Sequence, residues 1–361
     1  MTTAGPFRVV LINVAVCLAL AVVAEAVFGS WFSGSSYGSL NLPRNVTSYY
    51  DTSGLYAGGG TIRYSRDEHG LRGDYADPSR IDILTIGGST TNQLYVDDEQ
   101  TWQAHLHRYL AAAGHPAVVV NAAVDGQSTR GHIALFDRWF PGIPNLHARW
   151  ILAYVGINDT AVDNAEQWDR MESPEPARRL RYWILNNSAL YNLFRTVRGT
   201  FKAYNAKLVH GTPIYDGQAW ERFLPVGESP PTASRTADLA AYEDRLRLLV
   251  RRIREAGAEA ILVSQPTAEF RVRDGWVWVV RLPNGVLDSG GYGTMAAFNR
   301  VTMTVCRQLE AICLDLAAAI EFGDGDFYDR LHNTPQGTEK IGRYLAERLQ
   351  EHLAPSPLAA R

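Results

Sequence analysis

Short apolar runs alternate with amphipathic stretches over most of the chain beyond residue 80. The apolar runs have the length of buried strands and lie at residues 81–86, 117–121, 150–155, 258–264 and 313–316. The stretches between them repeat apolar residues at i, i+3 and i+4, as amphipathic helices do, and lie at residues 101–113, 238–256, 295–309 and 336–353. This alternation is typical of βα units that build a parallel sheet covered by helices. We therefore predict an α/β domain at residues 81–353.

The amino terminus has a different pattern, because residues 9–28 are apolar except for Asn13 and Glu25. A helix of about 20 such residues is long enough to cross the hydrocarbon core of a bilayer. Arg8 precedes the run and no basic residue follows it before Arg44. The positive-inside bias then places the amino terminus in the cytoplasm and the rest outside. We predict a transmembrane anchor at residues 1–28 of a single-pass membrane protein, with the domain that follows on the extracytoplasmic side.

A cleaved signal peptide is the alternative to an anchor. The small-x-small form of Ala24, Glu25 and Ala26 fits a cleavage site after an apolar run of suitable length. Cleavage there would give a secreted protein. The sequence favours the anchor and leaves cleavage open.

Two cysteines bear on the compartment. In an oxidising environment, Cys306 and Cys313 could form a disulfide between a helix and a strand, and two buried free thiols are the alternative. The sequence leaves both open.

Charge and histidine distribution argue against several classes of function. Thirty-five basic residues face thirty-eight acidic ones, a formal net charge of −3, and no dense Lys/Arg stripe is present to neutralise a phosphate backbone. The nine histidines are scattered without an H-E-x-x-H motif or a Cys/His cluster. We therefore predict no nucleic-acid partner, no metal and no cofactor.

Three segments lie outside the βα rhythm. Residues 29–80 are rich in Gly, Ser, Tyr and Asn, which suits a spacer and surface loops or short strands. Residues 160–234 carry many aromatic side chains among charges, and we interpret them as an inserted cap. Residues 354–361 form a tail. Loops at the carboxyl ends of parallel strands surround the ligand crevice, so the cap is expected near the site.

Candidate catalytic residues lie at both ends of the α/β region. The first strand runs into Gly-Gly-Ser-Thr at residues 87–90, where the glycines allow a tight turn that presents Ser89 at the crevice. Asp329 precedes His332 by three residues on a turn, so the carboxylate can orient an imidazole that acts as a base. The alternatives are a serine that caps a helix or lies in an anion-binding turn, and a histidine at the surface or in a cap.

Two middle segments offer donors for a developing oxyanion. Gly126 follows the second strand and can present a backbone N–H where a side chain would block approach. Asn158 follows the third strand and can offer its side-chain amide from the same rim. A turn glycine and a loop asparagine are the alternative interpretations.

These four segments, in this order and at these strand ends, resemble the conserved blocks of the SGNH (GDSL-like) hydrolase superfamily over roughly residues 81–353. The resemblance implies a flavodoxin-like three-layer α/β/α sandwich with a central parallel sheet. It also implies ester hydrolysis through an acyl-enzyme. Ser89 would be the nucleophile, His332 the base, Asp329 its partner, and the Ser89 amide, Gly126 and Asn158 the oxyanion hole. The first block reads Gly-Gly-Ser-Thr instead of Gly-Asp-Ser-Leu, which resembles many bacterial membrane-anchored members.

The expected function is removal of O-acetyl or other short acyl groups from an envelope carbohydrate or a related ester. The expected partners are an acylated small molecule or glycan and the membrane. The expected location is the bacterial cell membrane, with the catalytic domain extracytoplasmic. Transfer of the acyl group to a cell-envelope glycan is one alternative. A non-catalytic envelope module that binds glycan or protein through residues 160–234 is another. The sequence indicates no oligomeric state.

Overall fold

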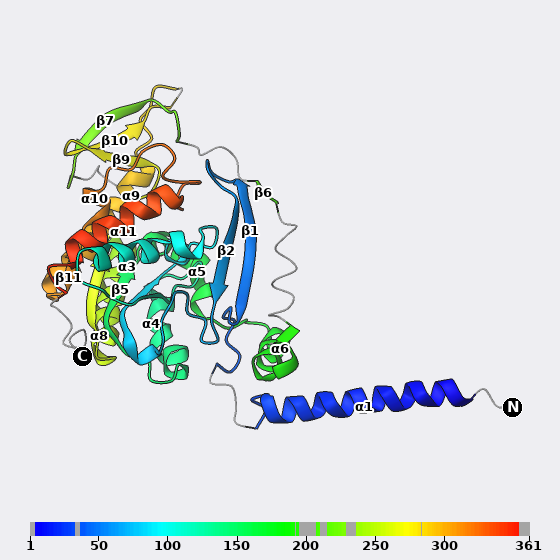
Figure 1. Cartoon of the computed structure of the whole chain (residues 1–361). Coiled ribbons are helices and arrows are strands. Elements are labelled where there is room, and N and C mark those ends of the chain that lie inside the picture. Colours follow the sequence, from blue (N-terminus) through cyan, green and yellow to red (C-terminus); the bar gives the residue numbers. More distant parts are fainter. Residues whose placement is uncertain are drawn as a thin grey trace.

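The computed structural model describes residues 4–32, 37–191, 193–194, 207–209, 215–228, 236–282 and 284–353. The predicted tail at residues 354–361 and parts of the predicted cap lie outside the described residues. Figure 1 shows a body built around one sheet, from which a long amino-terminal helix projects.

The central sheet has five parallel strands in the order β11-β8-β5-β3-β4. The strands are β3 (Ile81–Gly87), β4 (Val119–Asn121), β5 (Ala148–Tyr154), β8 (Glu259–Val263) and β11 (Ile312–Leu314). They coincide with the five predicted apolar runs. Numbered along the chain, the order is 2-1-3-4-5, which is the flavodoxin-like arrangement. The predicted α/β fold with a central parallel sheet is confirmed.

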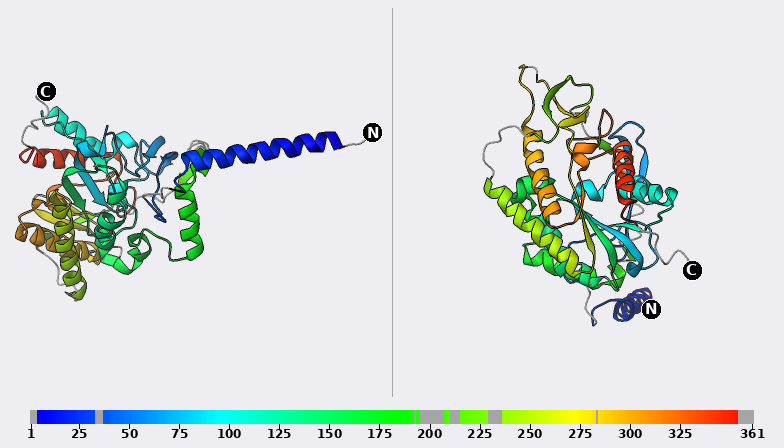
Figure 2. Two further views of the ribbon diagram at one scale, coloured as in Figure 1. Left: turned by 90° about the horizontal axis from the view of Figure 1, so that it is seen from below. Right: turned by 90° about the vertical axis from the view of Figure 1, so that its left-hand side faces the viewer.

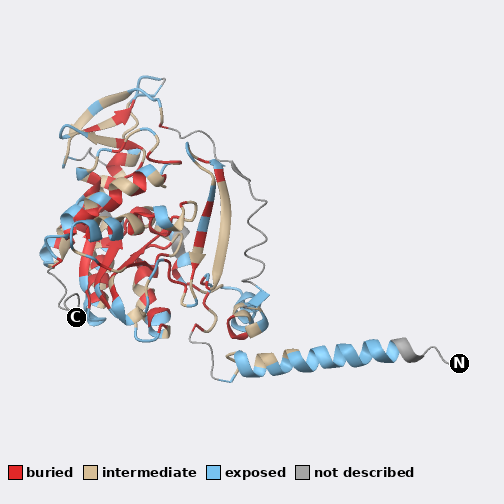
Figure 3. Ribbon diagram, viewed as in Figure 1, coloured by how far each residue is buried: buried red, intermediate tan, exposed pale blue. Residues whose placement is uncertain are grey.

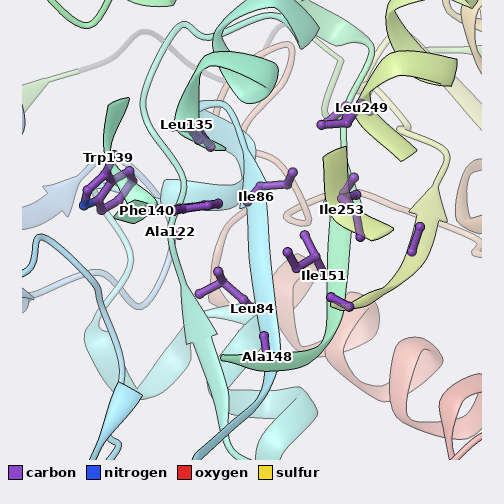
Figure 4. Packing of buried hydrophobic residues seen from close by; sticks show 14 of the residues in the cluster. Leu84, Ile86, Ala122, Leu135, Trp139, Phe140, Ala148, Ile151, Leu249 and Ile253 are labelled. Carbon is purple, nitrogen blue, oxygen red and sulfur yellow. The ribbon is translucent and has the colours of Figure 1, made fainter. Parts of the chain in front are cut away.

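Helices cover both faces of this sheet because successive strand residues point to opposite sides. Ile83 packs with α3 (Trp102–Ala112) and α11 (Pro335–Leu349) on one face. Leu84 and Ile86 pack on the other face with the longer helices, as Figure 4 shows for part of that cluster. Those helices are α4 (Thr129–Arg138), α8 (Thr236–Glu255) and α9 (Gly290–Gln308). The result is a sheet between two helical layers.

Shorter helices and 3-10 turns lie between the longer elements along the chain. These are the helices α2 (Ser89–Asn92), α5 (Val162–Asp169), α6 (Pro176–Asn187) and α10 (Leu316–Ala319), and the 3-10 turns η1 (Pro78–Arg80), η2 (Asp98–Gln100), η3 (Phe140–Gly142) and η4 (Ile157–Ala161).

Two small sheets flank the body. In the first, β1 (Val46–Gly54) and β2 (Thr61–Arg66) form an antiparallel hairpin within the segment predicted as spacer and surface loops or short strands, and β6 (Lys207–Val209) pairs parallel with β1. In the second, β10 (Trp276–Val280) lies between β9 (Phe270–Arg273) and β7 (Trp220–Pro225). The segment predicted as a cap therefore pairs with the loop that follows β8.

Helix α1 (Ala4–Phe28) projects from the body, and its apolar side chains are exposed (Figure 3). Residues Phe7–Phe28 have a mean hydropathy of 2.5 and are long enough to cross a membrane. A transmembrane anchor and a signal sequence both have this length and composition.

A disulfide joins Cys306 of α9 to Cys313 of β11, across a sequence separation of 7 residues. Cys306 is fully buried and packs in the core on one face of the sheet. The bond therefore ties the end of a covering helix to the edge strand that follows it. Of the two alternatives that the sequence left open, the structure contains the disulfide.

Replacing both Cys306 and Cys313 with Ala should lower the free energy of unfolding by about 2 kcal/mol, because closing even this short loop restricts the unfolded chain. Chemical denaturation of the purified full chain with and without reductant measures the change. Reductant should weaken the native protein and leave the double variant unchanged. In denaturing detergent without reductant, only the Cys17 thiol should react with a maleimide. Three reactive thiols under those conditions would contradict the disulfide.

Candidate active site

The turn after β3 presents Ser89 at the carboxyl edge of the sheet. Strand β3 ends at Gly87, and α2 begins at Ser89, with Gly88 as its N-cap residue. Ser89 is half-buried, whereas the residues on either side of it are buried. Because the first N–H groups of a helix lack intrahelical acceptors, the Ser89 amide is available to hold negative charge beside the Ser89 hydroxyl.

The Ser89 hydroxyl lies 2.8 Å from His332 Nε2, although 243 positions separate the two residues. On the other side of the ring, His332 Nδ1 lies 2.7 Å from Asp329 Oδ2. A carboxylate can only accept, so Nδ1 carries the proton and Nε2 accepts from the serine hydroxyl. The structure thus brings the three predicted residues into one hydrogen-bonded chain.

The loop that holds Asp329 also keeps it ionised. Its Oδ1 accepts from the backbone N–H groups of Leu331 and His332, each at 2.8 Å. Burial alone would raise the pKa of the Asp329 carboxyl. The hydrogen bond and charge of His332, together with the two backbone donors, outweigh burial and hold that pKa below its ordinary value.

An aromatic ring fixes the plane of the imidazole. The Tyr328 ring stacks on His332 with centroids 5.6 Å apart and an interplanar angle of 10°. Tyr328 is buried and also contacts Tyr56 and Tyr95. The imidazole is therefore supported from one face by a tyrosine cluster that includes a residue from the loop between β1 and β2.

Asn158 and Gly126 lie at the same edge of the sheet as Ser89. Asn158 Nδ2 donates to the Gln127 carbonyl at 2.8 Å and lies so close to Gly88 that a Cβ there would overlap with it. Gly126 has a φ of +75°, and a Cβ on it would lie 2.5 Å from the Trp168 indole. Positions 88 and 126 therefore require glycine, because a Cβ at either one would overlap with the neighbouring side chain. The structure brings all five predicted site residues to one edge of the sheet.

Comparison with known families agrees with this geometry. The family model of the GDSL-like lipases and acylhydrolases matches residues 85–340, which is most of the α/β body. The chain belongs to the GDSL-like lipase/acylhydrolase family. Members of this family are ester hydrolases of the SGNH type, so the chain is an enzyme of that type. The chain matches none of the curated proteins in sequence.

Several solved structures are similar to this acylhydrolase. TesA is 16% identical, with 75% of this chain and 98% of that chain covered and a TM-score of 0.38. An acetyl xylan esterase from Geobacillus stearothermophilus is 16% identical, with coverages of 75% and 96% and a TM-score of 0.41. An aryl esterase from M. smegmatis is 14% identical, with coverages of 76% and 100% and a TM-score of 0.41.

Gln265 links two of the site segments of the acylhydrolase and was not among the predicted residues. Its Oε1 accepts from the Ile157 N–H at 2.7 Å, and its Nε2 donates to Thr90 Oγ1 at 2.9 Å. It therefore fixes the turn that carries Asn158 relative to the turn that carries Ser89. Gln265 follows β8 at the carboxyl edge of the sheet. Asn158 was predicted because it follows a strand, and the same criterion could have identified Gln265.

Two buried arginines hold the segment that follows Ser89. Arg66 of β2 donates to Asn92 Oδ1 and to the Ala123 carbonyl, each at 2.6 Å. Arg72 donates to the Asn92 carbonyl at 2.5 Å and to the Gln93 carbonyl at 3.0 Å. The amino-terminal hairpin and the loop after it thus lock α2 in place. No sequence signal marked either arginine, because the contacts are far apart along the chain.

A cavity of about 590 Å³ adjoins the site of the acylhydrolase. Its wall includes Gly126, Asn158 and Leu331, and it extends to the Trp168 indole, which is 43% exposed. Half of its remaining lining residues are polar, namely Thr160, Thr267, Glu269, Thr294 and Arg330. A ligand in this space would lie next to the residues predicted to form the oxyanion hole.

An ion pair forms part of the wall of this cavity. The Arg330 guanidinium contacts the Glu269 carboxylate, which is buried, while Arg330 is exposed. Gly291 packs against the same carboxylate, and a Cβ there would overlap with it. The two charged groups therefore line the same cavity as the Trp168 indole.

Gly88→Ala should displace the Asn158 amide, because the added methyl group would occupy its place. If that amide holds the oxyanion, turnover falls by a factor on the order of 10² to 10³, as it should for Asn158→Ala. Turnover of a nitrophenyl acetate measures both variants. Gly60→Ala is the matched control, since nothing lies within 4 Å of a Cβ at that position. Full turnover in Asn158→Ala would remove that residue from the oxyanion hole.

Proposed function

We propose that this SGNH-type ester hydrolase is a serine esterase that acts through an acyl-enzyme, with Ser89 as nucleophile, His332 as base and Asp329 as its partner. The single observation that carries the proposal is the continuous hydrogen-bonded chain from the Ser89 hydroxyl through the His332 ring to the Asp329 carboxylate. A serine capping a helix would have no need of such an imidazole.

In the proposed first half of the reaction, Ser89 Oγ attacks the ester carbonyl while its proton passes to His332 Nε2. The charge that develops on imidazole is stabilised by Asp329, whose lowered pKa keeps it ionised at neutral pH. The Ser89 and Gly126 amides and the Asn158 side chain hold the oxyanion. Collapse of the tetrahedral intermediate breaks the bond to the alcohol, which takes the proton from Nε2.

The second half repeats these steps with water. Water gives a proton to His332 Nε2 and attacks the acyl-enzyme. The new tetrahedral intermediate then expels Ser89 Oγ, which recovers the proton, and the acid is released. The same residues therefore serve acylation and deacylation, and the enzyme returns to its starting state.

The cavity favours a carbohydrate as the alcohol part of the substrate. Sugars present hydroxyl groups at their edges and C–H groups on their faces. Glu269 and Arg330 can hydrogen-bond hydroxyls, and the exposed Trp168 indole offers an apolar surface on which a ring can lie. We propose O-acetyl or short acyl groups on an envelope glycan as the substrate class.

The proposed location is the extracytoplasmic side of a bacterial membrane, to which α1 anchors the domain. The apolar helix and the basic residue that precedes it support this orientation. The Cys306–Cys313 disulfide is also typical of an oxidising compartment.

Ser89→Ala should abolish labelling by a fluorophosphonate probe and lower ester turnover by a factor on the order of 10⁴ to 10⁶. Ser79→Ala is the matched control, because that exposed serine precedes the opposite end of β3. Gel fluorescence and acetate release measure the two effects. Equal labelling of both variants would contradict a nucleophilic Ser89 and would favour a non-catalytic binding module.

Trp168→Ala should raise the KM for an acetylated oligosaccharide roughly tenfold, the worth of one ring contact, and Trp168→Phe should restore most of it. Turnover of nitrophenyl acetate should stay nearly constant, because that ester has no sugar ring. Equal losses on both substrates would mean that the indole supports Gly126 instead.

A glycan acceptor should leave acetate release unchanged, whereas an acetylated acceptor as the main product would identify an acyltransferase.

A further inference from the structure

We propose that α6 and the helical residues after it rest on the surface of the bilayer that α1 crosses, and that α1 is a permanent, folded part of the protein. We call this surface the membrane seat and define it by Leu180, Trp183, Ile184, Leu190 and Leu193. The inference does not depend on the esterase chemistry. It rests on the contacts at the carboxyl end of α1.

Glu25, the one acidic residue in the apolar run, is bound to the body of the protein. Its carboxylate accepts from Ser188 Oγ at 2.6 Å and from the N–H groups of Ala189 and Leu190 at 3.0 and 3.1 Å. It also accepts from Trp31 Nε1 at 2.7 Å. A carboxylate is favourable at the start of a helix, where N–H groups lack partners.

This contact lies within the small-x-small motif that could serve as a cleavage site. Cleavage after Ala26 would remove Glu25 and leave the N–H groups of Ala189 and Leu190 without that acceptor. A signal peptide that is discarded has no reason to cap a helix of the mature domain. The Glu25 contacts therefore favour the anchor over the cleaved signal.

Two further contacts join the ends of α1 and α6. The Ser30 N–H donates to the Asn187 carbonyl at 2.9 Å. The Trp31 and Trp183 rings meet edge to face with centroids 5.6 Å apart. Figure 2 shows α6 running crosswise to α1 at the level of its carboxyl end, and Figure 1 shows the same level from another side. If α1 follows the bilayer normal, α6 must lie in the plane of the membrane surface.

The outer face of α6 has the composition of a helix at a membrane interface. Leu180, Trp183 and Ile184 follow an i, i+3, i+4 spacing, and their exposed fractions are 57%, 43% and 41%. Leu190 and Leu193 continue the exposed apolar surface beyond Ser188. Such patches are rarely left in water, and tryptophan is enriched at membrane interfaces.

Charge favours lipid over a second copy of the chain as the occupant of this face. Arg178, Arg179 and Arg181 lie exposed on the same helix, as is usual for helices that lie on anionic lipid surfaces. Arg178 pairs with Glu175, whereas Arg179 and Arg181 flank the apolar residues at helical spacing, where anionic lipid headgroups would meet their guanidinium groups. The seat is also continuous with α1, which already defines where the bilayer ends.

The test uses the full chain with Cys17→Ser as background, since the other two cysteines are in the disulfide. Single cysteines replace Leu180 or Ile184 in the seat, and the exposed Glu347 of α11 as the matched control. Each variant is labelled with an environment-sensitive fluorophore and reconstituted, one chain per nanodisc, with anionic lipids. Lipids that carry a nitroxide on the acyl chain then quench the fluorescence of any label that lies at the membrane surface.

We expect quenching at positions 180 and 184 to be several-fold stronger than at 347, and the intact mass to include residues 1–28. Glu25→Ala should weaken the quenching at 184 without changing fluorophosphonate labelling of Ser89.

Equal quenching at all three sites, or a mass that begins after Ala26, would overturn the proposal. So would weak quenching at 184 combined with cross-linking between chains at that position, which would assign the face to a second copy. Unchanged quenching in Glu25→Ala would disprove the role of the Glu25 contact.

Discussion

The parallel alignment of five strands is the constraint on which the rest of this structure depends. Parallel strands end at a common edge, so each loop that follows a strand begins at the same rim. Ser89, Gly126 and Asn158 follow three neighbouring strands of the sheet. The imidazole comes from a loop before α11, and the helical layer that α11 forms with α3 brings it to the same rim. Residues far apart in sequence thus meet at one edge of the sheet.

Such a rim must be held in place, and most of the supporting side chains are buried. Guanidinium groups from the amino-terminal hairpin and from the loop after it bind carbonyl groups near Ser89. Gln265 spans two turns, and Tyr328 supports the imidazole from one face. Because each supporting group has hydrogen-bonding or packing partners, its burial does not leave unpaired polar atoms behind. The geometry of the candidate site is therefore set by the packing around the rim as much as by the site residues themselves.

The sequence predicted those parts of the fold that depend on local patterns. The five strands were identifiable because each is a short apolar run between turn residues, and Ser89 and Asn158 because they directly follow such runs. His332 was identifiable because a carboxylate precedes it at a useful spacing. The contacts of Arg66 and Arg72 were not predictable, because they join the amino-terminal region to turns beyond residue 90. The pairing of β7 with β10 is equally non-local, so the sequence indicated only that β7 lies in the segment interpreted as a cap.

Burial explains why the sequence could not decide between a disulfide and two free thiols. Both a free thiol and a bonded cysteine are apolar enough for the core, so hydrophobicity does not separate them. The distinction depends on whether the end of α9 and the start of β11 approach closely, which only the tertiary arrangement determines. Here the two Cα atoms lie 5.7 Å apart, within the range that a disulfide spans.

The carboxylate that joins α1 to the helical residues after Ser188 has a consequence for how such an enzyme would meet its substrate. A domain on a long flexible linker moves through a wide range of heights above the bilayer. A domain held directly at the end of its anchor would keep its proposed catalytic serine at a fixed distance from the membrane surface. Its search is then confined to two dimensions. Only polymer segments that pass through that thin layer come within reach, so selectivity would depend on where along a glycan the ester lies as well as on its chemistry.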